Sequence, residues 1–219
     1  LVEYDELMLL QKERARSSNS FSSVLPESLS IEGSTEFIGY EYKNVNTKVV
    51  ELISSTKETK SKNLVEDEEG VVILEETPFY AESGGQIGDR GTISGKGFVF
   101  DVLDTQKIGD HHGHFGVVRE GNLKIDTKVK AHIDESFREK IVPNHSATHL
   151  LQAALKKILG DHIEQKGSLV GENRLRFDFS HSEQVNAEQI IDIEDLVNLQ
   201  IEKNSKSVTK IMTIEEAIK

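Results

Sequence analysis

Two histidines that are four residues apart, His145 and His149, have the spacing in this sequence that is best suited to chemistry. They lie within residues 143–160, where Pro143 suits a first helical turn and Gly160 sits where a helix stops. Residues four apart on a helix have Cβ atoms about 5–6 Å apart, so two imidazoles can converge on one zinc ion. A polar helix face that carries two histidines without a metal has the same spacing. The pair therefore indicates half of a possible metal site and names no function by itself.

The predicted helix has an apolar stripe that must face the rest of the protein. We expect it to pack on a sheet through Leu150, Leu151 and Ala154, while His145 and His149 lie on the opposite side. Because the histidines lie outside the buried stripe, the helix should fold without metal.

Length, charge and composition limit the class of protein. The chain has 219 residues and a net charge of −12, with a pI near 5.2. We expect two domains. Because no basic field attracts RNA, any contact with RNA must be local or must rest on parts of a larger protein outside this chain. Cysteine is absent, which excludes disulfides and thiolate chemistry within the chain. No apolar run approaches the ~20 residues of a membrane span, so we expect no membrane contact and a cytoplasmic location.

The chain divides into three parts by composition. Residues 1–30 predict a helix and a serine-rich linker. Residues 31–133 hold short β-rich runs separated by glycines, which predict a glycine-rich antiparallel β-barrel; the polar segment 54–69 should be an exposed loop. Residues 134–219 predict an α+β domain that carries the histidine helix after a charged segment, 134–140. The fold class is therefore α+β.

Within the last part, further elements have clear signals. The strict alternation of residues 174–179 predicts a half-buried strand. Asn186 and Gln189 resemble a capping box at the start of a helix. The remaining runs predict a strand at residues 207–212 and the start of a helix at 214–219.

A second stretch with the residue types of a binding site is the glycine-rich segment 76–91. It joins a strand to a loop with polar side chains that include Thr77 and Gln86. Gly84 and Gly85 allow the backbone to approach a ligand closely or to adopt positive φ. A glycine turn at a barrel rim has a similar composition, so both interpretations stay open for the segment alone.

Four stretches together resemble the editing region of the alanyl-tRNA synthetases, in that family's order and spacing. They are TPFYAESGGQ at 77–86, NHSATHLL at 144–151, QKGSLV at 165–170 and LRFDFS at 175–180. Threonyl-tRNA synthetases share the His-x-x-x-His helix, but the first stretch is similar only to the alanyl enzymes and their free-standing editing relatives. Residues 1–16 also look like the end of the tRNA-recognition domain that precedes editing, and the start at Leu1 suggests an internal piece of a longer protein.

The resemblance implies an editing reaction. The region would hydrolyse serine or glycine mischarged onto tRNA(Ala), because a pocket for alanine cannot strongly exclude either amino acid. His145 and His149 would be zinc ligands, while Thr77 and Gln86 would be the catalytic residues that face the aminoacyl group. The parent enzyme would join alanine to tRNA(Ala) with ATP and Mg in an upstream domain, and would oligomerise through a downstream one.

The zinc site that the resemblance implies is only half present. In the family a downstream Cys-x-x-x-His supplies two more ligands, and this chain has no cysteine. We therefore expect the isolated chain to bind zinc weakly and to edit poorly. Whether zinc activates water or holds the tRNA 3′ end stays open. A non-catalytic tRNA-docking fragment and a free-standing trans-editing deacylase are the alternatives.

No other histidine offers an obvious third ligand. His111, His112 and His114 fall in the barrel region, where we expect a solvated turn. His162 follows the predicted helix and His181 ends a predicted strand, neither at a spacing that suggests a ligand.

Overall fold

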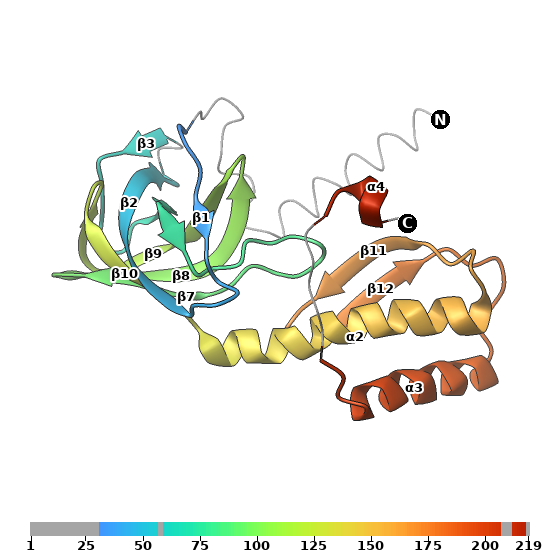
Figure 1. The fold of residues 1–219 in the computed structure, drawn as a ribbon. Helices are drawn as coiled ribbons and strands as arrows, with labels where there is room; N and C mark the ends of the chain where they lie inside the picture. Colours follow the sequence, from blue (N-terminus) through green and yellow to red (C-terminus); the bar gives the residue numbers. More distant parts are fainter. Residues whose placement is uncertain (1–30, 57–58, 207–211, 218–219) are drawn as a thin grey trace, which may run out of the picture.

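The computed structural model describes residues 31–56, 59–206 and 212–217 (Figure 1). The expected α+β class is confirmed, since an antiparallel β-barrel is followed by helices and a two-stranded sheet. The helix and linker expected at residues 1–30 lie outside the described residues. The strand expected at 207–212 also lies outside them, except for Met212.

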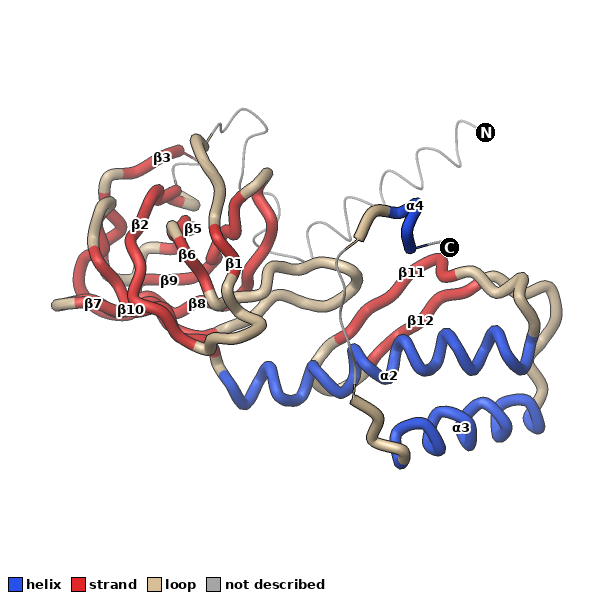
Figure 2. Tube along the Cα trace, in the orientation of Figure 1, coloured by secondary structure: helices blue, strands red, loops and turns tan. Residues whose placement is uncertain are grey.

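Six strands close the barrel in the order β10–β7–β8–β9–β5–β2, and β2 pairs back with β10 (Figure 2). All of these pairings are antiparallel. Alternate side chains fill the interior, so Leu52, Val72 and Phe100 are fully buried in one core. The strands are β2 (Asn44–Ser54), β5 (Glu69–Leu74), β7 (Gly91–Gly95), β8 (Phe98–Ile108), β9 (His111–Lys124) and β10 (Lys128–Ile133).

Four further strands, each two or three residues long, lie outside the six-stranded barrel path. β1 (Glu36–Phe37) pairs in parallel with β6 (Glu76–Thr77), which leads into the glycine-rich segment. β3 (Thr59–Ser61) pairs antiparallel with the end of β2, and β4 (Asn63–Val65) pairs antiparallel with β9. Residues 54–69 were expected to form an exposed loop; they contain two strands instead, although most of the described residues among them are exposed. Leu64 is fully buried in the barrel core and fixes this polar segment to it.

The histidine helix α2 (Glu135–Leu159) begins before Pro143, so the predicted start and the separate charged segment 134–140 were wrong. Asp134 caps the helix by accepting from the backbone N–H of Phe137 at 3.0 Å. Phe137 is buried and anchors the first turn. The helix can then continue through Pro143, at the cost of one backbone hydrogen bond.

The second half of α2 packs between a hairpin and another helix, as Figures 1 and 2 show. The hairpin consists of β11 (Gln165–Val170) and β12 (Leu175–Phe179). Ala154 is buried in the shared core, and Leu151 and Ile158 pack against it with Phe177 and Phe179. The predicted packing through Leu151 and Ala154 is thus confirmed, whereas Leu150 is half-buried and lies outside this core.

The other helices follow their sequence signals. α3 (Ala187–Glu202) has the predicted capping box between Asn186 and Gln189, with both hydrogen bonds formed at 2.9 and 3.0 Å. α4 (Ile214–Ala217) is a single turn within the region where a helix was expected to start. Within the parts of the chain that the structure describes, none of the helices has the length and apolarity of a membrane span.

A buried ion pair fixes the start of α2 against the barrel. The Asp89 side chain is 1% exposed and accepts from the Arg138 guanidinium. Arg138 also donates to the carbonyl oxygens of Gly39 and Pro78, each at 2.6 Å. Asp89 in turn accepts from the backbone N–H of Tyr80 at 2.7 Å. One cation therefore joins α2, the turn after β1 and the glycine-rich segment.

Breaking this pair should cost far more stability than breaking an exposed one. Replacing Arg138 with Met leaves the Asp89 carboxylate buried without its cation, so we expect the free energy of unfolding to fall by about 3–5 kcal/mol. Urea unfolding of the 219-residue chain measures this. The control is Lys43→Met, because Lys43 pairs with Glu135 at 2.7 Å between exposed side chains and its loss should barely move the midpoint. Equal losses in both variants would contradict the prediction.

Candidate functional site

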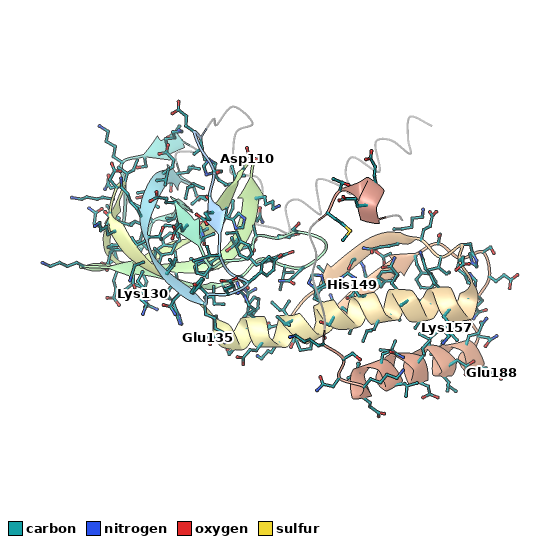
Figure 3. All side chains as sticks on the ribbon, in the orientation of Figure 1. Asp110, Lys130, Glu135, His149, Lys157 and Glu188 are labelled. Atoms are coloured by element: carbon teal, nitrogen blue, oxygen red, sulfur yellow. The ribbon has the colours of Figure 1, made fainter. Side chains whose placement is uncertain are left out.

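A pocket of about 500 Å³ lies where α2 faces the turn after β1 and the glycine-rich segment. Its residues come from three parts of the chain that are distant in sequence, and Figure 3 labels His149 about midway along α2. The lining residues are Phe37, Gly39, Tyr40, Glu41 and Lys43 from β1 and its turn, Tyr80 and Gln86 from the glycine-rich segment, and Arg138, Val142, His145, Ser146 and His149 from α2.

The two histidines stand one above the other on α2 with their rings stacked, the centroids 5.2 Å apart and the planes at 21°. His145 Nδ1 lies 2.6 Å from the side-chain oxygen of Gln86. Because an amide oxygen only accepts, Nδ1 carries the proton of a neutral ring and Nε2 keeps its lone pair. Burial, and then the neighbouring His149, lower the pKa of His145, which favours this neutral form. His145 therefore has the protonation state of a metal ligand or a proton acceptor.

A tight glycine turn presents Gln86 to His145. Ser83 and Gln86 exchange backbone hydrogen bonds of 3.0 and 3.2 Å across the turn. Gly84 and Gly85 have φ values of +61° and +85°, the left-handed region that favours glycine. Of the two possibilities that the sequence left open for these glycines, both positions therefore show positive φ.

The same turn docks on the edge of β11. Gly85 accepts from the N–H of Val170 at 2.7 Å, and Ile87 donates to the Val170 carbonyl at 3.1 Å. A Cβ on Gly85 would come within 2.6 Å of the Ser168 carbonyl oxygen, so only glycine fits there. This docking leaves Gln86 only 6% exposed and fixes it between the barrel and α2.

Thr77 lies inside the barrel in a closed hydrogen-bond network. Its hydroxyl oxygen is 2.7 Å from His114 Nε2, while His114 Nδ1 is 2.7 Å from the Val72 carbonyl. The carbonyl only accepts, so Nδ1 carries the proton and Thr77 donates to Nε2. The Phe79 N–H donates to the same hydroxyl at 3.2 Å. Burial lowers the pKa of His114 to about 3, which keeps the ring neutral.

The structure brings three of the four predicted site residues together. Gln86, His145 and His149 line one pocket, whereas Thr77 is fully buried and does not line it. Sequence reasoning missed Arg138 as a residue of this pocket. Its position, seven residues before His145 on one helix, was a usable signal only once the helix was known to start before Pro143.

The remaining histidines do not complete a metal site. His111, His112 and His114 belong to β9 and pair with β8, and His111 and His114 are buried, so the expected solvated turn was wrong. His162 and His181 stack with centroids 5.1 Å apart, at the far end of α2. In residues 31–56, 59–206 and 212–217, no group of three or more histidine, aspartate or glutamate side chains is placed to hold a metal ion.

Comparisons with known proteins place the chain in a family. Residues 2–137 match the family model of the tRNA synthetases class II (A). The chain therefore belongs to the class II (A) tRNA synthetases. Over 214 residues it is 44% identical to the alanine–tRNA ligases of Legionella pneumophila strains Corby, Paris and Lens. The matched region covers 98% of this chain and 25% of each relative, so the chain spans about a quarter of their length. The resemblance to the alanyl-tRNA synthetases that the motifs indicated is confirmed.

The Thr77–His114 network makes a prediction about stability. Thr77→Val keeps the shape of the side chain but leaves the buried Nε2 of His114 without a donor. We expect the free energy of unfolding to fall by about 1–3 kcal/mol, measured by urea denaturation. Thr77→Ser keeps the hydroxyl and serves as the control, with a smaller loss. A Thr77→Val chain as stable as the wild type would show that the hydrogen bond contributes nothing.

Proposed function

We propose that this region is the editing site of an alanine–tRNA ligase and hydrolyses seryl- or glycyl-tRNA(Ala) formed by mischarging. The observation that carries the proposal is the Gln86–His145–His149 group, which lines a pocket between the barrel and α2. Its support from outside the site is the 44% identity to alanine–tRNA ligases over nearly the whole chain.

A separate hydrolytic site has a physical reason in this family. A pocket built for alanine discriminates by only about 1–3 kcal/mol against an amino acid that lacks one methylene, and it rejects an added hydroxyl only about 100-fold. Glycine and serine therefore enter an alanine site at a rate that translation cannot tolerate. A second pocket that binds them and spares alanine removes the error.

Gln86 is the residue that we propose to face the aminoacyl group. Its oxygen is engaged by His145 Nδ1, while its amide nitrogen offers two donors for a substrate hydroxyl or ester carbonyl. A serine hydroxyl can take such a bond and an alanine methyl cannot, which gives polar discrimination. The free lone pair of His145 is then on Nε2, the atom that would bind a metal ion. Thr77 acts from within the barrel, where it holds the strand that begins the loop.

His145 and His149 fit one side of a zinc site. The stacked rings lie 5.2 Å apart, and the hydrogen bond that His145 donates to Gln86 fixes its tautomer, as the hydrogen bonds donated by metal-bound histidines do. Zinc held there would act as a Lewis acid on the ester or water, or would anchor the tRNA end. Two ligands are fewer than the three or four of ordinary zinc sites, so we propose that the rest come from the downstream Cys-x-x-x-His of the family.

For the whole protein we propose the activity of its relatives. It joins alanine to tRNA(Ala) with ATP and Mg in the cytoplasm, and oligomerises through a part of the protein downstream of this region. A non-catalytic tRNA-docking role is the second candidate, favoured by the two-ligand metal site. A free-standing deacylase is disfavoured, because the synthetase family model already matches from residue 2 onward.

The first test separates editing from alanine activation in the full-length protein. Gln86→Leu removes the donors that face the substrate, so seryl-tRNA deacylation should fall by roughly a hundredfold. Alanine activation, measured by ATP–pyrophosphate exchange, should stay unchanged because it belongs to another domain. Gln152→Leu on α2 is the control, since Gln152 does not line the pocket. An equal loss of activation and deacylation in Gln86→Leu would exclude our placement of Gln86.

The second test concerns zinc. The 219-residue chain should lose zinc on mild chelation while its helix content, followed by circular dichroism, stays the same. A form extended through the downstream Cys-x-x-x-His should keep one zinc and gain seryl-tRNA deacylation. Stoichiometric zinc in the short chain after chelation would overturn the half-site assignment, and a His145→Ala substitution would show whether that zinc sits elsewhere.

A further inference from the structure

One wall of the pocket is aromatic, and its outermost ring is open to solvent. Tyr40, in the turn after β1, is 86% exposed, and Phe37 and Tyr80 lie beside it in the pocket lining. A single exposed tyrosine is ordinary on a protein surface. Here the exposed ring belongs to a cluster at the mouth of the pocket that contains His145.

Contacts from behind hold this wall in place. The Phe37 ring meets Tyr40 edge-on at 5.0 Å and Tyr80 at 5.9 Å, and it stacks on His112 at 5.3 Å. The Tyr80 hydroxyl donates to the Ser83 carbonyl at 3.2 Å, which ties the wall to the glycine turn. Tyr40 is therefore supported on one side and offers its ring to a ligand on the other.

The charges around the pocket favour an uncharged planar group over a phosphate. Lys43 is paired with Glu135 at 2.7 Å and with Glu139 at 3.5 Å. Arg138 is committed to Asp89 and to two carbonyl oxygens. The exposed carboxylate of Glu41 also lines the pocket, and the net charge of the chain is −12. Base stacking, which needs no cation, is the contact that this wall can provide.

We propose that Tyr40 stacks on the base of the 3′-terminal nucleoside of the tRNA and so delivers the aminoacyl ester on its ribose to Gln86 and His145. This inference rests on the proposed editing function. The terminal nucleoside is unpaired and has a phosphate on one side only, so it fits an aromatic wall with little free positive charge. Tyr40 is then a positioning residue that binds substrate without taking part in the bond-breaking step.

The test is steady-state deacylation of seryl-tRNA by the full-length protein. Tyr40→Ala should raise KM roughly tenfold and leave kcat unchanged, because one stacked base is lost before chemistry. Tyr40→Trp should restore KM, since a larger ring still stacks. The matched control is Tyr42→Ala, because Tyr42 is 55% exposed two residues away and does not line the pocket. The KM ratio between Tyr40→Ala and wild type should persist at high salt.

Several outcomes would overturn the assignment. They are equal KM values in Tyr40→Ala and Tyr42→Ala, a loss confined to kcat, or a KM difference that vanishes at high salt and so reports a phosphate contact. Binding of a non-hydrolysable 3′-serylamido adenosine, measured by calorimetry, tests stacking without the reaction. If the wild type binds this analogue through Tyr40 yet hydrolyses no seryl-tRNA, the proposed function fails and the stacking site stands. If the wild type does not bind it, the stacking site fails.

Discussion

The buried ion pair between Asp89 and Arg138 determines how the two halves of the molecule meet. Arg138 lies two turns before His145 on the same face of α2, so the pair that fixes Arg138 also sets the position of the histidines. A buried pair stabilises a fold only when its remaining donors and acceptors are satisfied. Here Gly39, Pro78 and the Tyr80 N–H complete the set, and each belongs to a segment that borders the pocket.

Gln86 is held in place by the glycine turn and by the hairpin that packs on α2. The left-handed turn at Gly84 and Gly85 aims its side chain, and the bridge to Val170 attaches the turn to the hairpin that packs on α2. The Gln86 residue therefore contacts α2 through its side chain and β11 through its backbone turn. The bond of 2.6 Å between Gln86 and His145 is the point where these constraints meet, which gives the site a fixed geometry before any substrate arrives.

Much of the local structure followed from sequence periodicity. The alternation of strands such as β12, the glycine that ends α2 and the capping box of α3 act over a few residues and need no tertiary information. Gln86 and the histidine pair could be singled out because their motifs lie within short stretches. Their hydrogen bond could not, because it joins residues 59 positions apart.

The predictions that were wrong concern residues whose structure depends on contacts with distant segments. Pro143 is compatible with a helix start, and the earlier start at Glu135 is set by the Asp134 cap and by the burial of Phe137. His111 and His114 are polar in sequence, yet β9 buries them because Thr35 and Thr77 supply hydrogen-bond partners from distant segments. The wall formed by Phe37 and Tyr40 likewise depends on ring contacts of Phe37 with Tyr80 and His112, which are distant in sequence. Local sequence patterns cannot predict such contacts.

The closure of the barrel has a consequence for biosynthesis. Asn44 on β2 pairs with His132 on β10. One edge of β2, the first long strand, therefore stays unpaired until β10, the last strand of the barrel, has been made. During translation, nearly the whole barrel must leave the ribosome before it can close, and α2 follows within two residues of β10. The nascent chain therefore exposes an unpaired strand edge until late, the state in which β-rich proteins are most prone to aggregate. The histidine helix follows β10 directly, so its residues leave the ribosome just after the strand that closes the barrel.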